Sequence, residues 1–92
     1  MKIERLSFIV SPADKTNDFI DADAKIWNPH LQLQKGYIRK TSQVYAGGRV
    51  EIQIFWKDAA AQKTAEGNLN LELIDRQLQL AFPGVYRLLY SD

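Results

Sequence analysis

The sequence predicts one α+β domain of ferredoxin-like βαββαβ order, in which an antiparallel four-stranded sheet carries helices on one face. Three observations support this fold class. Four segments have the alternation or the β-branched and aromatic content of strands. Segments between them repeat apolar residues at helical spacing, and 92 residues are enough for one hydrophobic core but too few for two.

The first strand is predicted over residues 2–10, where one side is formed by Leu6, Phe8 and Val10. Ser11 and Pro12 have the composition of a helix start, so a helix is expected to begin at Pro12. Pro29 is expected to end or bend this helix, because proline removes a backbone donor. The apolar positions of the helix form one face: Phe19, Ile20, Ile26, Trp27 and Leu31.

The second and third strands are predicted over residues 37–45 and 50–56, joined by a hairpin turn that contains Gly47 and Gly48. Antiparallel pairing follows from the short connection. The third strand has the clearest alternation in the chain, with one side formed by Val50, Ile52, Ile54 and Trp56.

Two helices and a closing strand complete the order. Asp58 is predicted to cap a short helix over residues 59–65, and Asn70 to cap another that runs to Phe82. The leucines of the latter form two stripes, which predicts two neighbours. Residues 85–90 have the composition of the fourth strand.

Apolar residues are expected on both faces of this sheet, although the helices cover only one. The uncovered face would include Ile3, Ile9, Ile38, Val44 and Phe55. An exposed patch of that kind typically marks a partner surface. We therefore expect a homodimer in which two sheets pack face to face about a twofold axis.

Composition restricts the partners and the location. The chain has no cysteine and no signal-peptide pattern in residues 1–10, which predicts a cytoplasmic protein. No apolar run has membrane-spanning length, and the formal charge is only +1, so neither membrane nor nucleic acid is expected. With one histidine and no cysteine, no metal site is expected, and no motif indicates a cofactor.

Four stretches of the sequence are similar to segments of a known protein family: residues 23–27, 35–37, 54–56 and 86–90. With them the chain resembles a family of short proteins, found mainly in photosynthetic bacteria, in the dimeric α+β barrel superfamily. That superfamily also contains the antibiotic biosynthesis monooxygenases. The resemblance implies a homodimer with a pocket between helices and sheet in each subunit, where relatives bind aromatic substrates or haem. The Asn, Trp and His of haem-degrading members have no recognisable counterparts here, so haem is not expected.

Asp23 is the first candidate site residue, because it lies in the apolar stripe between Phe19 and Trp27, where an unpaired carboxylate is costly to bury. One reading is a pocket carboxylate with a raised pKa that serves as a base or anchors a ligand hydroxyl. The other is a structural pair with Arg39 or with a tyrosine on the sheet.

His30, seven positions further on, is the second catalytic candidate as a proton shuttle, or else a capping residue. The candidate ligand-binding residues, which also suit a core or an interface, are Trp27, Arg39, Trp56 and Tyr90. The leading hypothesis is a pocket for a small aromatic ligand, supporting cofactor-free monooxygenase or isomerase chemistry with Asp23 as base. The alternative is a non-catalytic dimeric interaction module.

Overall fold

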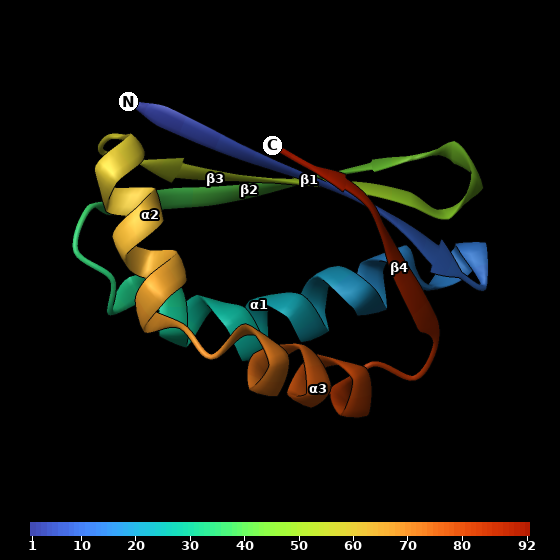
Figure 1. Cartoon of the computed structure of the whole chain (residues 1–92). Coiled ribbons are helices and arrows are strands. Elements are labelled where there is room, and N and C mark those ends of the chain that lie inside the picture. The colour runs from blue at the N-terminus through green and yellow to red at the C-terminus, as the bar shows by residue number, and fades with distance from the viewer.

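The structure, a computed structural model, describes residues 1–92 and confirms the predicted ferredoxin-like order. Helices α1 and α3 lie along one face of the sheet, α2 stands at one end, and the other face is uncovered (Figure 1). None of the helices has both the length and the apolar content that a membrane span requires. The elements are β1 (Lys2–Ser11), α1 (Thr16–Gln32), β2 (Tyr37–Tyr45), β3 (Arg49–Trp56), α2 (Ala59–Asn68), α3 (Leu71–Ala81) and β4 (Val85–Ser91).

The sheet has the strand order β2-β3-β1-β4, and every neighbouring pair is antiparallel. In the β1–β3 register Leu6 pairs with Ile52 and Phe8 with Val50, so these side chains share the face toward the helices. The predicted alternation in β3 is confirmed, since its apolar series is buried on that face. The inner face of the sheet is therefore set by the period-two pattern of its central strands.

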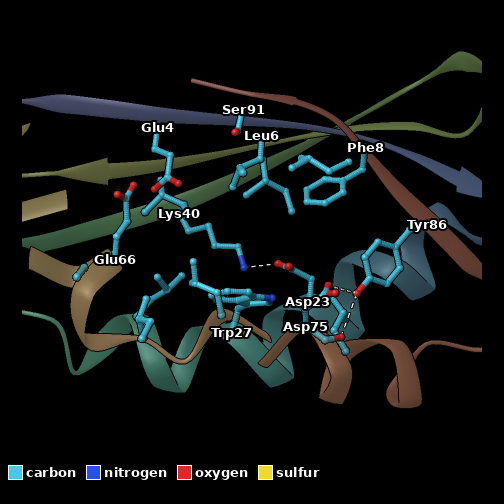
Figure 2. Close-up of a pocket in the computed structure, with 18 of the residues that line it drawn as sticks. Glu4, Leu6, Phe8, Asp23, Trp27, Lys40, Glu66, Asp75, Tyr86 and Ser91 are labelled. Carbon is cyan, nitrogen blue, oxygen red and sulfur yellow. Dashed lines mark hydrogen bonds and ion pairs between the residues drawn. The ribbon is translucent and has the colours of Figure 1, made fainter. Parts of the chain in front are cut away.

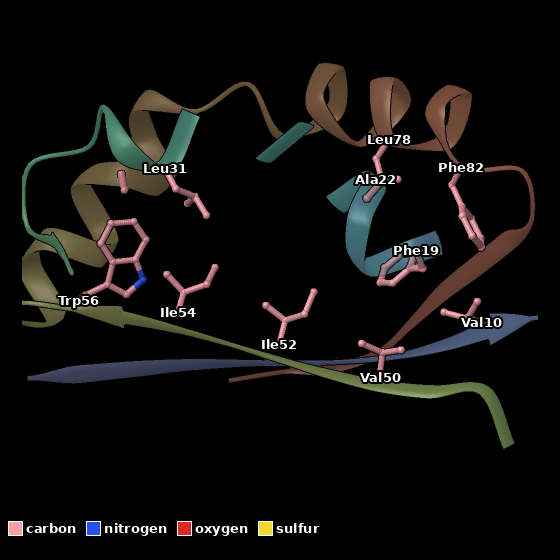
Figure 3. Close-up of a cluster of buried hydrophobic side chains, with 11 residues drawn as sticks. Val10, Phe19, Ala22, Leu31, Val50, Ile52, Ile54, Trp56, Leu78 and Phe82 are labelled. Carbon is pink, nitrogen blue, oxygen red and sulfur yellow. The ribbon is translucent and has the colours of Figure 1, made fainter. Parts of the chain in front are cut away.

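Phe19 of α1 is the centre of the aromatic part of the core and is completely buried. Its ring lies 5.2 Å from that of Phe8, 5.5 Å from that of Phe82 and 5.1 Å from that of Tyr86, measured between centroids. Tilted and edge-on pairs at these separations add to the area they bury. Figure 3 shows Phe19 and Phe82 of this core between α1, α3 and the sheet, while Trp56 and Leu31 fill the end near α2.

The start of α1 differs from the prediction. Ser11 continues β1 by pairing with Val85 of β4, and Pro12 is extended, so the α-helix begins at Thr16 after a short 3-10 turn. Pro29 neither ends the helix nor prevents burial of Leu31 in the following turn. The apolar contacts of that last turn offset the backbone hydrogen bond that proline removes.

The predicted caps of α2 and α3 are confirmed. The Asp58 carboxylate accepts a hydrogen bond from the backbone N–H of Ala61 at 2.8 Å, and the Asn70 side chain accepts one from that of Leu73 at 3.2 Å. Only one stripe of α3 is covered, because Leu73 and Leu80 remain exposed. Within one subunit the second stripe has no neighbour, and a second neighbour for α3 stays a prediction.

The uncovered face of the sheet, here called the open face, is more polar than predicted. Val44 pairs with Val50 and so belongs to the inner face, which corrects its assignment. The register places aromatic Tyr45, Phe55 and Tyr90 on the open face, together with Ile3 and Ile9. Arginines alternate with them: Arg5, Arg39, Arg49 and Arg87.

Candidate functional site

A cavity of about 530 Å³, here called the central cavity, lies between the sheet and the helices. Its walls are mostly apolar and come from every strand and helix, with Leu6 and Phe8 from β1, Ile52 and Ile54 from β3, and Leu78 from α3. Trp27 of α1 and Trp56 of β3 also line it (Figure 2 labels Trp27). Pockets of this volume and character typically hold a small organic ligand.

Asp23 and Lys40 form a direct ion pair at the cavity wall (Figure 2). Asp23 comes from the inner side of α1 and Lys40 from the inner side of β2, and their side chains are only 7% and 9% exposed. The Lys40 ammonium also donates to the Asn28 side-chain oxygen at 2.9 Å. Burial raises the pKa of Asp23, and the adjacent Lys40 ammonium opposes part of that rise.

The same pair lines a second, smaller hollow. This hollow has a volume of about 120 Å³, and Ile20, Asn28 and Tyr37 are among the other residues that line it. Asp23 and Lys40 therefore contribute to the walls of both spaces.

The predicted pairing of Asp23 with Arg39 is wrong, because Lys40 is the partner. A register shift between Tyr37 and Arg39 sets which side of β2 each residue faces. Arg39 pairs with Phe55 across the sheet, and its guanidinium carbon lies 4.3 Å from the centre of that ring on the open face. Arg39 is thus separated from the cavity by the sheet itself.

Tyr86 and Asp75 form a second polar contact, at the cavity wall between β4 and α3 (Figure 2). The Tyr86 hydroxyl donates to the Asp75 carboxylate and lies 3.2 Å from the Asp75 backbone oxygen. Burial raises the pKa of Tyr86, and the Asp75 carboxylate raises it further. The Tyr86 hydroxyl therefore keeps its proton at neutral pH and is already engaged as a donor.

Glu4 and Glu66 lie at the end of the cavity near α2 (Figure 2). The indole N–H of Trp56 donates to the Glu4 carboxylate at 3.0 Å, which fixes the tryptophan ring. Burial raises the pKa of Glu4, the indole hydrogen bond opposes this, and the Glu66 carboxylate raises it further. Neither Glu4 nor Glu66 nor the pair of Tyr86 and Asp75 was indicated by the sequence, since each depends on contacts between distant segments.

Replacing Glu4 with Gln is expected to make the protein more stable at neutral pH but not below pH 4.5, the ordinary pKa of Glu4. Because folding raises this pKa, the folded state binds the proton more tightly, so stability falls as pH rises from 4.5 through the raised value. Glutamine carries no charge and still accepts from Trp56. Urea unfolding across pH measures the difference, with Glu72→Gln on the exposed side of α3 as control. Parallel pH profiles for the Glu4 variant and wild type would contradict the assignment.

The structure brings three of the predicted site residues together at the cavity: Asp23, Trp27 and Trp56. His30 is partly buried near the end of α1 but does not line the cavity, and its backbone oxygen accepts from Gln34 at 3.2 Å. Tyr90 pairs with Ser7 and lies on the open face, 46% exposed. No three potential metal-ligating side chains come together in the chain.

No family model and no curated protein matches the sequence. Among solved structures, SnoaB, a cofactor-independent oxygenase from Streptomyces nogalater, aligns with a TM-score of 0.66 at 17% identity, covering 96% of this chain and 89% of that one. A monooxygenase from the gene ActVA-Orf6 of Streptomyces coelicolor, in complex with nanaomycin D, gives 0.69 at 14% identity, covering 96% and 86%. A dimeric ferredoxin-like protein from an uncultured marine organism gives 0.71 at 11% identity, covering 98% and 89%.

These matches span nearly the whole chain, so they concern the complete fold. At identities this low they establish architecture, and activity has to be argued from the site. The resemblance to antibiotic biosynthesis monooxygenases is confirmed at the level of fold. The chain has the α+β fold of the dimeric ferredoxin-like proteins, which these oxygenases share.

Proposed function

We propose that the chain binds a small aromatic molecule carrying a hydroxyl group in the central cavity and promotes its cofactor-free oxidation. The observation that carries this proposal is the Asp23–Lys40 ion pair in the wall of an otherwise mostly apolar cavity. An aromatic body fits the apolar walls, and its hydroxyl group finds both a proton acceptor and a cation there.

The chemistry follows from that pair. The ligand hydroxyl donates its proton to the Asp23 carboxylate, whose raised pKa makes it a better acceptor than an exposed aspartate. The Lys40 ammonium then stabilises the phenolate oxygen. The electron-rich phenolate reacts with dioxygen, one oxygen atom enters the ring to give a quinone, and the other leaves as water. The substrate itself supplies the electrons, so no cofactor is required.

The comparisons support this class of reaction without identifying a substrate. Of the structures that share this fold, one is described as a cofactor-independent oxygenase and another as a monooxygenase in complex with nanaomycin D. The proposed roles are Asp23 as base, Lys40 as oxyanion stabiliser, and Trp27 and Trp56 as walls. His30 and Tyr90 have no role in this proposal, since neither lines the cavity.

Binding of nitrophenol and nitrobenzene tests the proposal. Both tryptophans of the chain line the cavity, so quenching of their fluorescence reports occupancy. A hydrogen bond to a charged group contributes about 1.5–3 kcal/mol, so nitrophenol is expected to bind roughly tenfold or more tightly than nitrobenzene. Bound nitrophenol is also expected to ionise at lower pH than free nitrophenol, as seen in its visible absorbance.

The control is the double variant Asp23→Leu/Lys40→Met, which removes the pair without leaving a buried charge. This variant is expected to bind both compounds equally. Oxygen uptake with naphthohydroquinone, corrected for autoxidation, then tests turnover and is expected to be lost in the variant. Equal affinity of the wild type for the two nitro compounds would overturn the proposed role of the pair.

We also propose that the chain forms a homodimer through the open face and β4, in the cytoplasm. β4 is an edge strand, and Leu88, Leu89 and Tyr90 along it are each more than 40% exposed. Apolar edge strands are normally protected by a partner. The dimeric ferredoxin-like protein of the same fold supports this arrangement, and the absence of cysteine suits a reducing compartment.

A further inference from the structure

We infer that the central cavity selects aromatic ligands that carry a protonated amine and disfavours those that carry a carboxylate. The inference rests on the proposed function, because it concerns the ligand of the same cavity. It adds a second contact: the hydroxyl group lies at Asp23 and Lys40, and the ammonium group lies between Glu4 and Glu66.

The charge of the cavity wall is strongly one-sided. Its titratable carboxylates are Glu4, Asp23, Glu66 and Asp75, and its only cation is Lys40. Lys40 neutralises Asp23 within their ion pair. A ligand carboxylate would therefore enter an apolar space that already holds an excess of negative charge, which is costly at low dielectric.

Three of these carboxylates, Glu4, Glu66 and Asp75, form no ion pair. The only ion pairs within 4.0 Å in the chain are Lys40 with Asp23 and Lys15 with Asp18. Glu4 accepts from the Trp56 indole, and Glu66 accepts from the Gln62 side-chain amide at 3.3 Å. These neutral donors satisfy one oxygen each but leave both negative charges uncompensated.

Glu4 and Glu66 are close enough to interact. Figure 2 shows their carboxyl groups directed toward the same end of the cavity, one from β1 and one from α2. The effect of Glu66 on the pKa of Glu4 is the repulsion expected of such neighbours, and it is larger than the opposing effect of Lys2. An ammonium group between them would relieve this repulsion and donate to both.

Asp75 differs from Glu4 and Glu66, because both of its carboxylate oxygens already accept hydrogen bonds, one from the Tyr86 hydroxyl and one from the Gln79 side-chain amide at 2.9 Å. The indole N–H of Trp56, which donates to Glu4 at 3.0 Å, holds that carboxylate in place at the cavity wall. The hydroxyl and the ammonium positions therefore impose one orientation on the ligand.

Three matched probes test the inference: tyramine, tyrosol and phloretate share a hydroxyphenyl ring and differ in an ammonium, a hydroxyl or a carboxylate at the tail. We expect tyramine to bind at least about tenfold more tightly than tyrosol, and phloretate to bind most weakly, by quenching of tryptophan fluorescence. A tenfold difference in affinity corresponds to about 1.4 kcal/mol. One charge-assisted hydrogen bond contributes up to about 3 kcal/mol, so a single such bond is enough to produce it.

The variant Glu4→Gln/Glu66→Gln should bind tyramine and tyrosol equally, while Glu72→Gln keeps the wild-type preference. A cooperative thermal transition at or above the wild-type melting temperature confirms that the variants are folded. If tyrosol binds and tyramine binds no more tightly, the inference is overturned and the proposed function stands. If none of the three probes quenches the fluorescence, the proposed binding function fails as well.

Discussion

Replacing Lys40 with methionine is expected to lower the free energy of unfolding by about 3–5 kcal/mol, the usual cost of breaking a buried ion pair from one side. The substitution leaves the Asp23 carboxylate, only 7% exposed, without its cation. The hydrogen bond to Asn28 is lost with the ammonium. Urea unfolding at neutral pH measures the effect, and the loss should shrink at low pH, where Asp23 accepts a proton and no longer carries a charge.

The double variant Asp23→Leu/Lys40→Met separates the cost of a stranded charge from the contribution of the pair. Replacing both partners with apolar residues of similar size is expected to be neutral or stabilising by about 1–4 kcal/mol. An ion pair that is kept for its chemistry therefore lowers the stability of the protein. Its removal should lower activity and leave stability unchanged or raised. If the double variant is as unstable as Lys40→Met alone, the pair is a structural element and its proposed chemical role is weakened.

Replacing Tyr90 with lysine is expected to weaken the dimer by roughly a thousandfold. Tyrosine side chains that carry binding energy contribute about 2 kcal/mol or more each, and a twofold interface contains every residue twice, which gives about 4 kcal/mol. Tyr90 lies on the open face of the edge strand β4, 46% exposed in one subunit. Sedimentation across protein concentration measures the dissociation constant.

Leu80→Lys is the matched control for this experiment, because Leu80 is 83% exposed on α3 and lies away from the sheet. It adds the same charge and should leave the dimer intact. A wild-type protein that sediments as a monomer at micromolar concentration would contradict the proposed dimer outright. An intact Tyr90→Lys dimer would instead show that copies associate through a different surface.

The strands and the buried face of the sheet are well predicted by the sequence. In β3, Val50, Ile52, Ile54 and Trp56 alternate with other residues, and the structure buries all four. The start of α1 was not predictable, because Ser11 belongs to β1 only through its pairing with Val85, seventy-four positions away along the chain. Local composition favoured a helix start there, and long-range pairing determined the outcome.

The candidate site was likewise predictable only where its signal is local. Asp23 stood out as a carboxylate on an apolar helix face, which is a local signal. Its partner Lys40 was not predictable, since a register shift in β2 decides whether Arg39 or Lys40 faces inward. The contact of Glu4 with Trp56 joins residues that are 52 positions apart in the chain, and no local pattern predicts it.

Because the Asp23–Lys40 pair lies between the central cavity and the smaller hollow, the proposed proton transfer to Asp23 also affects how the two spaces are separated. The pair is part of both walls, so separation of the two side chains would join the two spaces. Protonation of Asp23 in the proposed reaction removes the charge–charge attraction between the two side chains. The turnover step would then itself loosen the partition between the two spaces on the side of β2, and re-ionisation of Asp23 would restore it.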